Sequence, residues 1–280
     1  MSRRRLRHDT ASLREPLQLH IDDLSLRAGG HAGQRLLFER LQCHVGSGEF
    51  WAVLGPNGAG KSSLLAAIAG VFAIHAGQVL MQGKPLSAWA PAELADWRAW
   101  CPQFWSDPFA CSVRETASMA MHRSPWWEGE ADSDSAQVNA MLDALDLASL
   151  AEADVCRLSS GERQRVAIAT AMLQGTPLVL LDEPASHLDL AHQQLLYRLL
   201  ARERARGRAV MASLHDLNLA WDFATHAVLL DGAGGANAGA RDEVMTPANL
   251  SRLFGVGVER VEVCGQARFW IAPTDLVCRP

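Results

Sequence analysis

The sequence predicts an α/β fold with a mainly parallel sheet, an N-terminal antiparallel β subdomain and an inserted α-helical subdomain. Three observations support this prediction. The first part of the chain consists of short apolar or alternating stretches separated by turn residues, which is typical of strands. From about Pro91 to Asp154 the chain is rich in alanine, tryptophan and acidic residues, with helical spacing. Beyond that segment, apolar strands alternate with helices, which favours a parallel sheet covered on both faces.

The elements follow in order along the chain. The N-terminal half is expected to form a helix over 61–70 and strands over 17–26, 35–45, 49–55 and 77–83. Helical spacing over 135–150 belongs to the inserted subdomain. The C-terminal half is expected to form strands over 177–184, 209–215 and 226–232, and helices over 161–173, 190–207 and 216–224. The glycine-rich stretch 232–239 is predicted to be a flexible turn.

The chain is expected to divide into three parts. Residues 1–16 are basic and polar, and we expect a disordered arm there. Residues 17–245 carry the α/β pattern and include the helical subdomain at about 104–160. Residues 246–280 are expected to form a small α+β extension.

Composition argues against several classes of protein. The 280 residues are 49% hydrophobic and 20% charged, as in globular rather than disordered chains. The formal net charge of -5 argues against nucleic acid as a partner. Scattered cysteines indicate reduced thiols in a cytosolic protein. No apolar run reaches the roughly 18 residues of a membrane helix, so work at a membrane would require another chain to span it.

Residues 55–62, GPNGAGKS, match the pattern G-x-x-x-x-G-K-[ST] between an expected strand and an expected helix. In such a loop consecutive backbone N–H groups point at phosphate oxygens. Lys61 would bring a positive charge to the β and γ phosphates, and the Ser62 hydroxyl would bind Mg²⁺. The sequence therefore predicts a P-loop NTPase (RecA-like) core whose nucleotide-binding loop is Gly55, Pro56, Asn57, Gly58, Ala59, Gly60, Lys61, Ser62 and Ser63.

The apolar strand LVLL ends in two carboxylates, Asp182 and Glu183. Two acids at a solvent-exposed strand end need no functional explanation. A buried strand, however, rarely ends in two acids unless they bind a cation or take part in catalysis. Beside a phosphate loop, Asp182 is predicted to orient Mg²⁺, and Glu183 to polarise the water that attacks the γ-phosphate. Gln103 and His215 carry no such signal on their own.

The stretch RLSSGERQR, residues 157–165, combines two signals. Ser159 and Glu162 form the S-x-x-E pattern of a capping box, which starts a helix. Ser160 and Gly161 lie between them, at a helix start whose open backbone N–H groups can hold a phosphate. The chain would then have a second phosphate-binding element besides its phosphate loop.

Six motifs occur in the order and rough spacing of the nucleotide-binding subunits of ABC transporters: the phosphate loop, CPQ, LSSGE, LLDEP, SHLD and SLHD. The chain resembles this family over roughly Leu17 to Gly232. The resemblance implies two ATP molecules sandwiched head to tail between two copies of the chain, as a twofold dimer allows. Ser159, Ser160 and Gly161 would then meet the γ-phosphate held by the other copy.

The resemblance also implies roles for three further residues. Gln103 would lie near Mg²⁺ and the membrane partner, Asp189 would touch the opposite subunit, and His215 would contact the γ-phosphate. Closure by ATP and reopening after hydrolysis would drive the membrane partner.

The sequence departs from the family pattern at a few positions. Ser160 replaces the commoner glycine, and Glu162 stands where glutamine is frequent; a serine can still donate to phosphate. No aromatic residue lies around 27–28, where many relatives stack the adenine. Phe38 lies further along the chain and is expected in the core.

Comparison among ABC proteins favours an importer subunit that is separate from its permease. Chromosome ATPases need long heptad segments, paired translation factors need two phosphate loops, and exporters usually carry a fused membrane domain. The expected partners are two copies of a permease at the cytoplasmic face of the inner membrane and, indirectly, a periplasmic or extracellular binding protein. A soluble ABC ATPase without a transport partner is the alternative of another class.

Several stretches resemble importers of metal chelates, the group that handles cobalamin, ferric siderophores and haem. WRAWCPQFWSDPFACSVRETA, together with SHLDLAHQ, is most similar to the cobalamin branch, with siderophore and haem as the alternatives. The segment from Gln103 to Arg123 is the expected permease surface. Its apolar groups are Phe104, Trp105, Phe109 and Val113, with Trp126 and Trp127 nearby. The alternative is that the aromatic side chains pack inside the helical subdomain.

Overall fold

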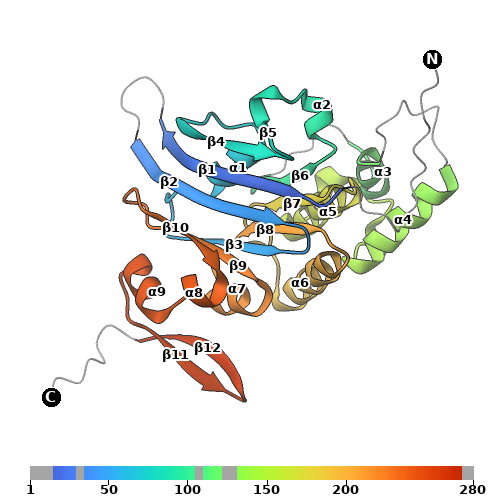
Figure 1. The fold of residues 1–280 in the computed structure, drawn as a ribbon. Coiled ribbons are helices and arrows are strands. Elements are labelled where there is room, and N and C mark those ends of the chain that lie inside the picture. Colours follow the sequence, from blue (N-terminus) through green and yellow to red (C-terminus); the bar gives the residue numbers. More distant parts are fainter. Residues whose placement is uncertain (1–14, 30–34, 105–109, 122–130, 273–280) are drawn as a thin grey trace.

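The computed structural model describes residues 15–29, 35–104, 110–121 and 131–272. These residues form a large sheet, a smaller N-terminal sheet, surrounding helices and a C-terminal hairpin (Figure 1). The smaller sheet is antiparallel and the larger one is mainly parallel. The fold class predicted from the sequence is therefore confirmed.

The larger sheet has the strand order β10-β9-β3-β8-β7-β6, and its pairs are parallel except for β10 with β9. Its strands are β3 (Phe50–Leu54), β6 (Arg98–Cys101), β7 (Leu178–Leu181), β8 (Ala209–Ser213), β9 (His226–Leu230) and β10 (Ala236–Ala240). Parallel strands end at a common edge, so the loops after β3, β6, β7 and β8 meet there.

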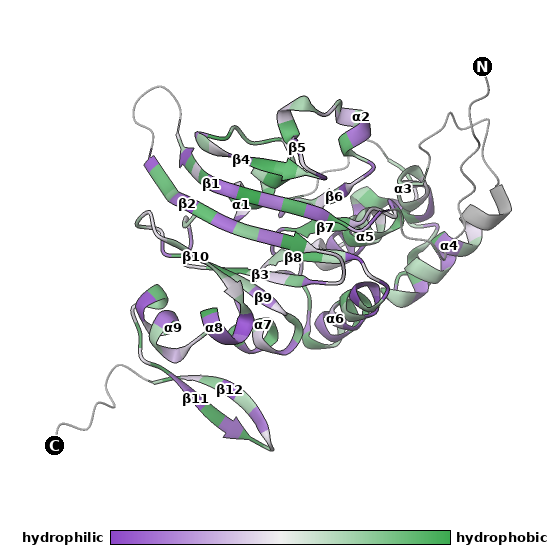
Figure 2. Cartoon of the chain, viewed as in Figure 1, coloured by the Kyte–Doolittle hydropathy of each residue, from purple (hydrophilic) through white to green (hydrophobic). Residues whose placement is uncertain are grey.

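The smaller sheet has the order β2-β1-β4-β5, with β1 (Gln18–Ala28), β2 (Arg35–Gly46), β4 (Ala76–Met81) and β5 (Lys84–Pro85). Leu19 and Ile21 of β1 are buried, while Gln18 and Asp22 are exposed. The same alternation of hydrophobic and hydrophilic residues is visible along β1 and β2 in Figure 2. A strand with one buried face produces this period of two.

Helices surround the large sheet. The longer ones are α1 (Lys61–Ile68), α3 (Val113–Met119), α4 (Ala131–Ala144), α5 (Ser160–Leu173), α6 (Leu190–Ala205), α7 (Leu217–Phe223) and α9 (Pro247–Phe254), and the short ones are α2 (Pro91–Leu94) and α8 (Arg241–Val244). Helices α3 and α4 lie at the end of the molecule away from the C-terminal hairpin (Figure 1). In the part of the chain that the structure describes, no helix has both the length and the apolar character needed to cross a membrane.

Strand β3 separates two apolar cores. Phe50, Ala52 and Leu54 pack in the core that includes side chains of α5, α6 and α7. Trp51 and Val53 pack in the other core, with α1 and the antiparallel sheet. Because both faces of the strand are covered, its sequence is apolar at every position.

The glycine-rich stretch 232–239 is only partly a turn, so that prediction was wrong for its second half. Residues 236–240 form β10, which pairs with β9 along its length. The Asp231 carboxylate accepts hydrogen bonds from the backbone N–H groups of Ala233 (2.7 Å) and Gly235 (2.8 Å) and so fixes the turn before it. Pairing with β9 outweighs the weak strand propensity of alanine and glycine.

The C-terminal hairpin, β11 (Val258–Val263) with β12 (Gln266–Ile271), is attached to α7. Asn218 accepts from the Phe269 backbone N–H (2.7 Å) and donates to the Phe269 carbonyl oxygen (3.2 Å). The Trp221 ring meets the Phe269 ring edge-on, with 5.3 Å between their centroids. The hairpin therefore packs against α7 rather than extending either sheet.

Candidate active site

The phosphate loop, residues 55–63, follows the end of β3 and runs into the first turn of α1. A Cβ on Gly55 would come 2.2 Å from the Leu230 carbonyl oxygen, so this position requires glycine. Gly60 is the N-cap of α1 and offers no side-chain oxygen to the first backbone N–H groups. These groups are left for an anion, which a helix N-terminus favours.

Lys61 starts α1 and is only 6% exposed. Its ammonium group donates to the carbonyl oxygens of Gly55 (2.8 Å) and Pro56 (3.1 Å). Burial lowers the pKa of Lys61, and the negative charges of Glu183 and Asp182 oppose that shift. The lysine and the two acids therefore belong to one site at the edge of the large sheet.

Ser213, at the end of β8, holds the acids that follow β7. Its hydroxyl donates to Asp182 Oδ1 (2.6 Å) and accepts from the Glu183 backbone N–H (2.7 Å). Ser213 is fully buried, and Asp182 is 4% exposed. Ser213 could not be identified from the sequence, because a serine at the end of an apolar strand gives no signal until β7 and β8 are known to be neighbours.

Glu183 lies between Gln103 and His215, which follow β6 and β8. Its Oε2 accepts from Gln103 Nε2 at 2.8 Å, and its Oε1 is 2.7 Å from His215 Nε2. Glu183 has a left-handed φ of 47°, a conformation that strains residues other than glycine and often occurs at functional sites. The structure thus brings Gln103 and His215, which the family resemblance places near Mg²⁺ and the γ-phosphate, onto Glu183, the residue predicted to polarise the attacking water.

The LSSGE stretch starts α5 with a complete capping box. The Ser159 hydroxyl accepts from the Glu162 backbone N–H (3.3 Å), and the Glu162 carboxylate accepts from the Ser159 backbone N–H (2.7 Å). Hydrogen bonds from the Ser159 hydroxyl and backbone lower the pKa of Glu162. A Cβ on Gly161 would come 2.7 Å from the His187 carbonyl oxygen, so close packing within the chain also explains this glycine.

Asp189 is the N-cap of α6, and its carboxylate accepts from the His192 backbone N–H at 2.9 Å. That hydrogen bond is the main cause of the lowered pKa of Asp189. In the described part of the chain, neither Ser159 nor Asp189 shares a hydrogen bond with the cluster around Glu183.

Two residues of β2 lie beside the phosphate loop. Arg35 Nη1 is 3.6 Å from the position that a Cβ would take on Gly58, and Arg35 Nη2 donates to the Gly232 carbonyl oxygen at 3.1 Å. Phe38 is fully buried, as expected, and its ring lies close to Gly60. Arg35 could not be identified from the sequence, because β2 and the phosphate loop are distant in the chain.

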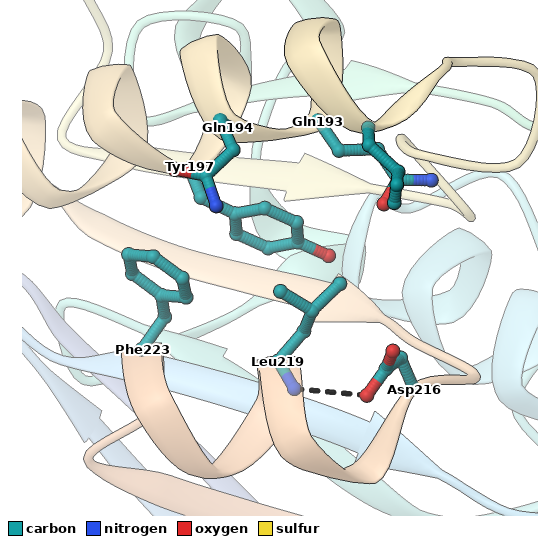
Figure 3. Close-up of a pocket in the computed structure, with 7 residues that line it drawn as sticks. Gln193, Gln194, Tyr197, Asp216, Leu219 and Phe223 are labelled. Carbon is teal, nitrogen blue, oxygen red and sulfur yellow. Dashed lines mark hydrogen bonds between the residues drawn. The ribbon is translucent and has the colours of Figure 1, made fainter. Parts of the chain in front are cut away.

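A groove of about 210 Å³ lies between α6 and α7 (Figure 3). It is lined by Leu190, Gln193, Gln194, Tyr197, Asp216, Leu219 and Phe223. The Tyr197 ring stacks on Phe223, with centroids 4.8 Å apart. Burial raises the pKa of Tyr197, and the charge of Asp216 adds to the shift. The groove adjoins Asp189 and His215 in the sequence but contains no residue of the phosphate loop.

The expected permease surface is only partly described. Phe104 is 79% exposed, as a docking residue would be. Val113 is fully buried at the start of α3, so its assignment to that surface was wrong; it packs in the core that includes α5. Four further members of the expected surface lie outside the described residues: Trp105, Phe109, Trp126 and Trp127.

A phosphate loop, a buried lysine and two acids at the end of a parallel strand define a P-loop nucleoside triphosphate hydrolase. The profile of the ABC transporter family matches residues 38–186. The hemin import ATP-binding protein HmuV of Streptomyces coelicolor is 43% identical over 237 residues, which cover 83% of this chain and 84% of that protein. The iron(3+)-hydroxamate import ATP-binding protein FhuC of Bacillus subtilis is 36% identical over 233 residues, which cover 82% of this chain and 86% of that protein.

Solved structures show the same fold. A metal-chelate type ABC transporter in an inward-facing conformation matches with a TM-score of 0.77 and 27% identity, covering 93% of this chain and 100% of that chain. A dimeric bacterial ABC transporter cassette matches with a TM-score of 0.71 and 21% identity, covering 79% of this chain and 98% of that chain. The chain belongs to the ABC transporter family. It is an ATP-binding, ATP-hydrolysing component of that family.

Proposed function

We propose that this chain hydrolyses ATP to power the import of a metal chelate, either haem or a ferric siderophore, through a separate permease. The relatives named for hemin and iron–hydroxamate import support these cargoes, as does the metal-chelate type transporter of similar structure. Cobalamin, ranked first from the sequence, fits less well, because the relatives compared above are named for the other two. The ATPase does not touch the cargo, so its sequence holds little information on cargo chemistry.

One observation carries the proposal of ATP hydrolysis: Glu183 is held between Gln103 and His215 at the edge that carries the phosphate loop. Two contacts fix the orientation of the carboxylate, so that it can accept a proton from an attacking water. His215 is 48% exposed at its side chain, so its ring also remains accessible to a bound phosphate. Glu183 acts as the general base, and Gln103 and His215 orient it.

Mg²⁺ is the metal that the site would use with ATP, and its residues fit that ion. Ser62, Asp182 and Gln103 offer oxygen atoms, the ligands that Mg²⁺ prefers. Ser213 binds only Oδ1 of Asp182, and Gln103 contacts Glu183 through its amide nitrogen, so oxygens of both side chains remain available. The ion would neutralise charge on the phosphates while Lys61 and the loop bind them.

A second copy of the chain would complete each site. Ser159 and Ser160 are exposed at the start of α5, and the capping box satisfies the Glu162 N–H rather than those of Ser160 and Gly161. These groups, together with Asp189, would meet ATP bound to the phosphate loop of the other copy. ATP would then close a head-to-tail homodimer.

The remaining assignments follow from this role. Residues 17–245 would form the ATPase domain, with the helical subdomain at about 104–160, and residues 246–280 an extension. Two permease copies would bind at the cytoplasmic face of the membrane, and exposed Phe104 supports a docking surface there. A binding protein on the other side of the membrane would deliver the cargo.

The substitution Glu183→Gln tests the catalytic assignment. The variant should bind ATP as the wild type does, hydrolyse it at least about 100-fold more slowly and accumulate as an ATP-bound dimer, because only the base is lost. Hydrolysis and size-exclusion chromatography with ATP would measure both effects. Glu259→Gln, at an exposed residue of β11, is the matched control and should behave as the wild type. Near-normal turnover of Glu183→Gln would exclude Glu183 as the base.

Cargo is tested by reconstituting the chain with its co-purifying permease and binding protein. Haem, a ferric hydroxamate and cobalamin are compared as stimulators of ATP hydrolysis. Haem or the hydroxamate should stimulate most. Stimulation by cobalamin alone would overturn the cargo assignment, and the absence of any co-purifying membrane protein would favour a soluble ATPase instead.

A further inference from the structure

His192, in the first turn of α6, lies between two carboxylates from different parts of the chain. Its Nδ1 is 2.8 Å from Asp189 Oδ1, and its Nε2 is 3.3 Å from Asp146 Oδ2. Asp189 caps α6, whereas Asp146 follows α4. Asp146 lies in the helical subdomain proposed at about 104–160, which is called the helical part below. One side chain thus connects the residue proposed to reach the second copy with the helical part.

Asp146 is itself held in place by α5. Arg165, which is 6% exposed, donates from Nη1 to the carbonyl oxygens of Leu145 (2.8 Å) and Asp146 (2.7 Å). Asp146 has a left-handed φ of 53°, a conformation that persists only when the surroundings support it. His192 therefore contacts a residue whose backbone is held by hydrogen bonds from α5.

The protonation of His192 decides how many of its bonds can form. A neutral imidazole has one N–H and can donate to one carboxylate, whereas the imidazolium form can donate to both. The charged groups around the ring are Asp189 from α6, Asp146 from the α4–α5 connection, and Glu162 and Arg165 from α5. Three carboxylates and one guanidinium make these surroundings negative overall.

We propose that His192 is a positioning residue that ties Asp189 to the helical part of the chain, so that movement of that part is transmitted to Asp189. The inference rests on the proposed function, in which Asp189 contributes to the second copy's ATP site. The tie is complete when the imidazole is protonated, because both carboxylates are then bonded. Loss of the contacts of His192 would leave the phosphate loop intact but would misplace Asp189, which acts on the ATP site of the other copy.

The test measures ATP hydrolysis by the full chain with Mg²⁺, from roughly pH 6 to pH 8.5, the range in which histidines change charge. His192→Gln should lower kcat about fivefold or more near pH 6, with little change in KM. The ratio of wild-type to variant kcat should shrink as the pH rises. His75→Gln is the matched control, because His75 is exposed and distant from His192 in the sequence. This variant should match the wild type at every pH.

Asp146→Asn tests the same tie from its other end, and the double variant tests whether the two residues act together. If His192 acts through Asp146, the double variant should be no slower than the slower single variant. Additive losses, or a wild-type to His192→Gln ratio that does not change with pH, would overturn the inference. Normal turnover of Glu183→Gln would defeat the proposed function instead, so the two failures are distinguishable.

Discussion

A single hydroxyl group organises the acids of the active site. Ser213 comes from β8, yet it contacts both Asp182 and Glu183 at the end of β7. The contact to the Glu183 backbone supports a residue whose left-handed φ of 47° is costly by on the order of 1–3 kcal/mol. The position of Glu183, the proposed general base, therefore depends on a neighbouring strand as well as on its own sequence.

Ser213→Ala should lower the free energy of unfolding by about 1–3 kcal/mol, because it leaves a buried carboxylate and a backbone N–H without their common partner. ATP hydrolysis should also fall, since both acids lose an anchor. Urea denaturation and a hydrolysis assay would measure the two effects. Ser118→Ala is the control: its hydroxyl bonds the Arg114 carbonyl within α3, and its loss should be nearly neutral. Equal stability of the two variants would contradict the role of Ser213.

At the scale of elements, the start of α5 serves two purposes. The capping box of Ser159 and Glu162 begins the helix, and Gly161 lets the helix approach the segment before α6. The same turn leaves Ser160 exposed, as the proposed contact with a second copy requires. Local stability and the proposed shared site therefore depend on the same few residues.

Glu162→Gln should make the unfolding free energy less dependent on pH. The folded-state pKa of Glu162 lies below its usual value of 4.5, so the ionised form stabilises the protein above that value. The stabilisation disappears as the pH falls through the lowered folded pKa. The wild type should thus exceed the variant at neutral pH and lose this advantage in acid, as measured by denaturation at several pH values. Ser159→Ala, which removes the hydroxyl that bonds Glu162 but keeps the backbone N–H, should cost about 1 kcal/mol at neutral pH. A difference that is constant with pH would contradict this account.

The C-terminal hairpin depends on its two hydrogen bonds to Asn218. Asn218→Ala should speed hydrogen exchange at the Phe269 N–H by about tenfold or more, because each bond contributes about 0.5–1.5 kcal/mol. Exchange in β7 should be unchanged. Asn249→Ala, which removes a similar bond to the Val244 carbonyl, is the matched control outside the hairpin. Unaltered exchange at Phe269 would show that the contact between the Trp221 and Phe269 rings is enough to hold the hairpin on α7.

At the scale of the whole molecule, the two apolar cores share the large sheet and should unfold together. Cys101 is buried at the end of β6, and burial raises its pKa to about 12. Cys264, by contrast, is exposed in the turn of the C-terminal hairpin. A maleimide at neutral pH should label Cys264 quickly and Cys101 only when the chain unfolds, because the thiolate is the nucleophile. Rapid labelling of Cys101 in the native protein, read by mass spectrometry, would show that β6 opens on its own.

Much of the fold could be predicted because its signals are local. The buried strands are continuous apolar runs, and the helices have their own caps and periodicity. Predictions failed where a distant partner decided the outcome. Residues 236–240 form a strand because they pair with β9. The Val113 side chain is buried in the core because α3 packs on α5.

The sequence by itself determined the phosphate loop, the acids after β7 and the capping box, because each consists of neighbouring residues whose chemistry depends on short-range spacing. Only the tertiary structure decided that Ser213 supports the acids, that Gln103 and His215 meet on Glu183, and that His192 reaches Asp146. Those contacts join residues far apart in the chain. They depend on the order of the strands and the packing of the helices, which no short stretch of sequence encodes.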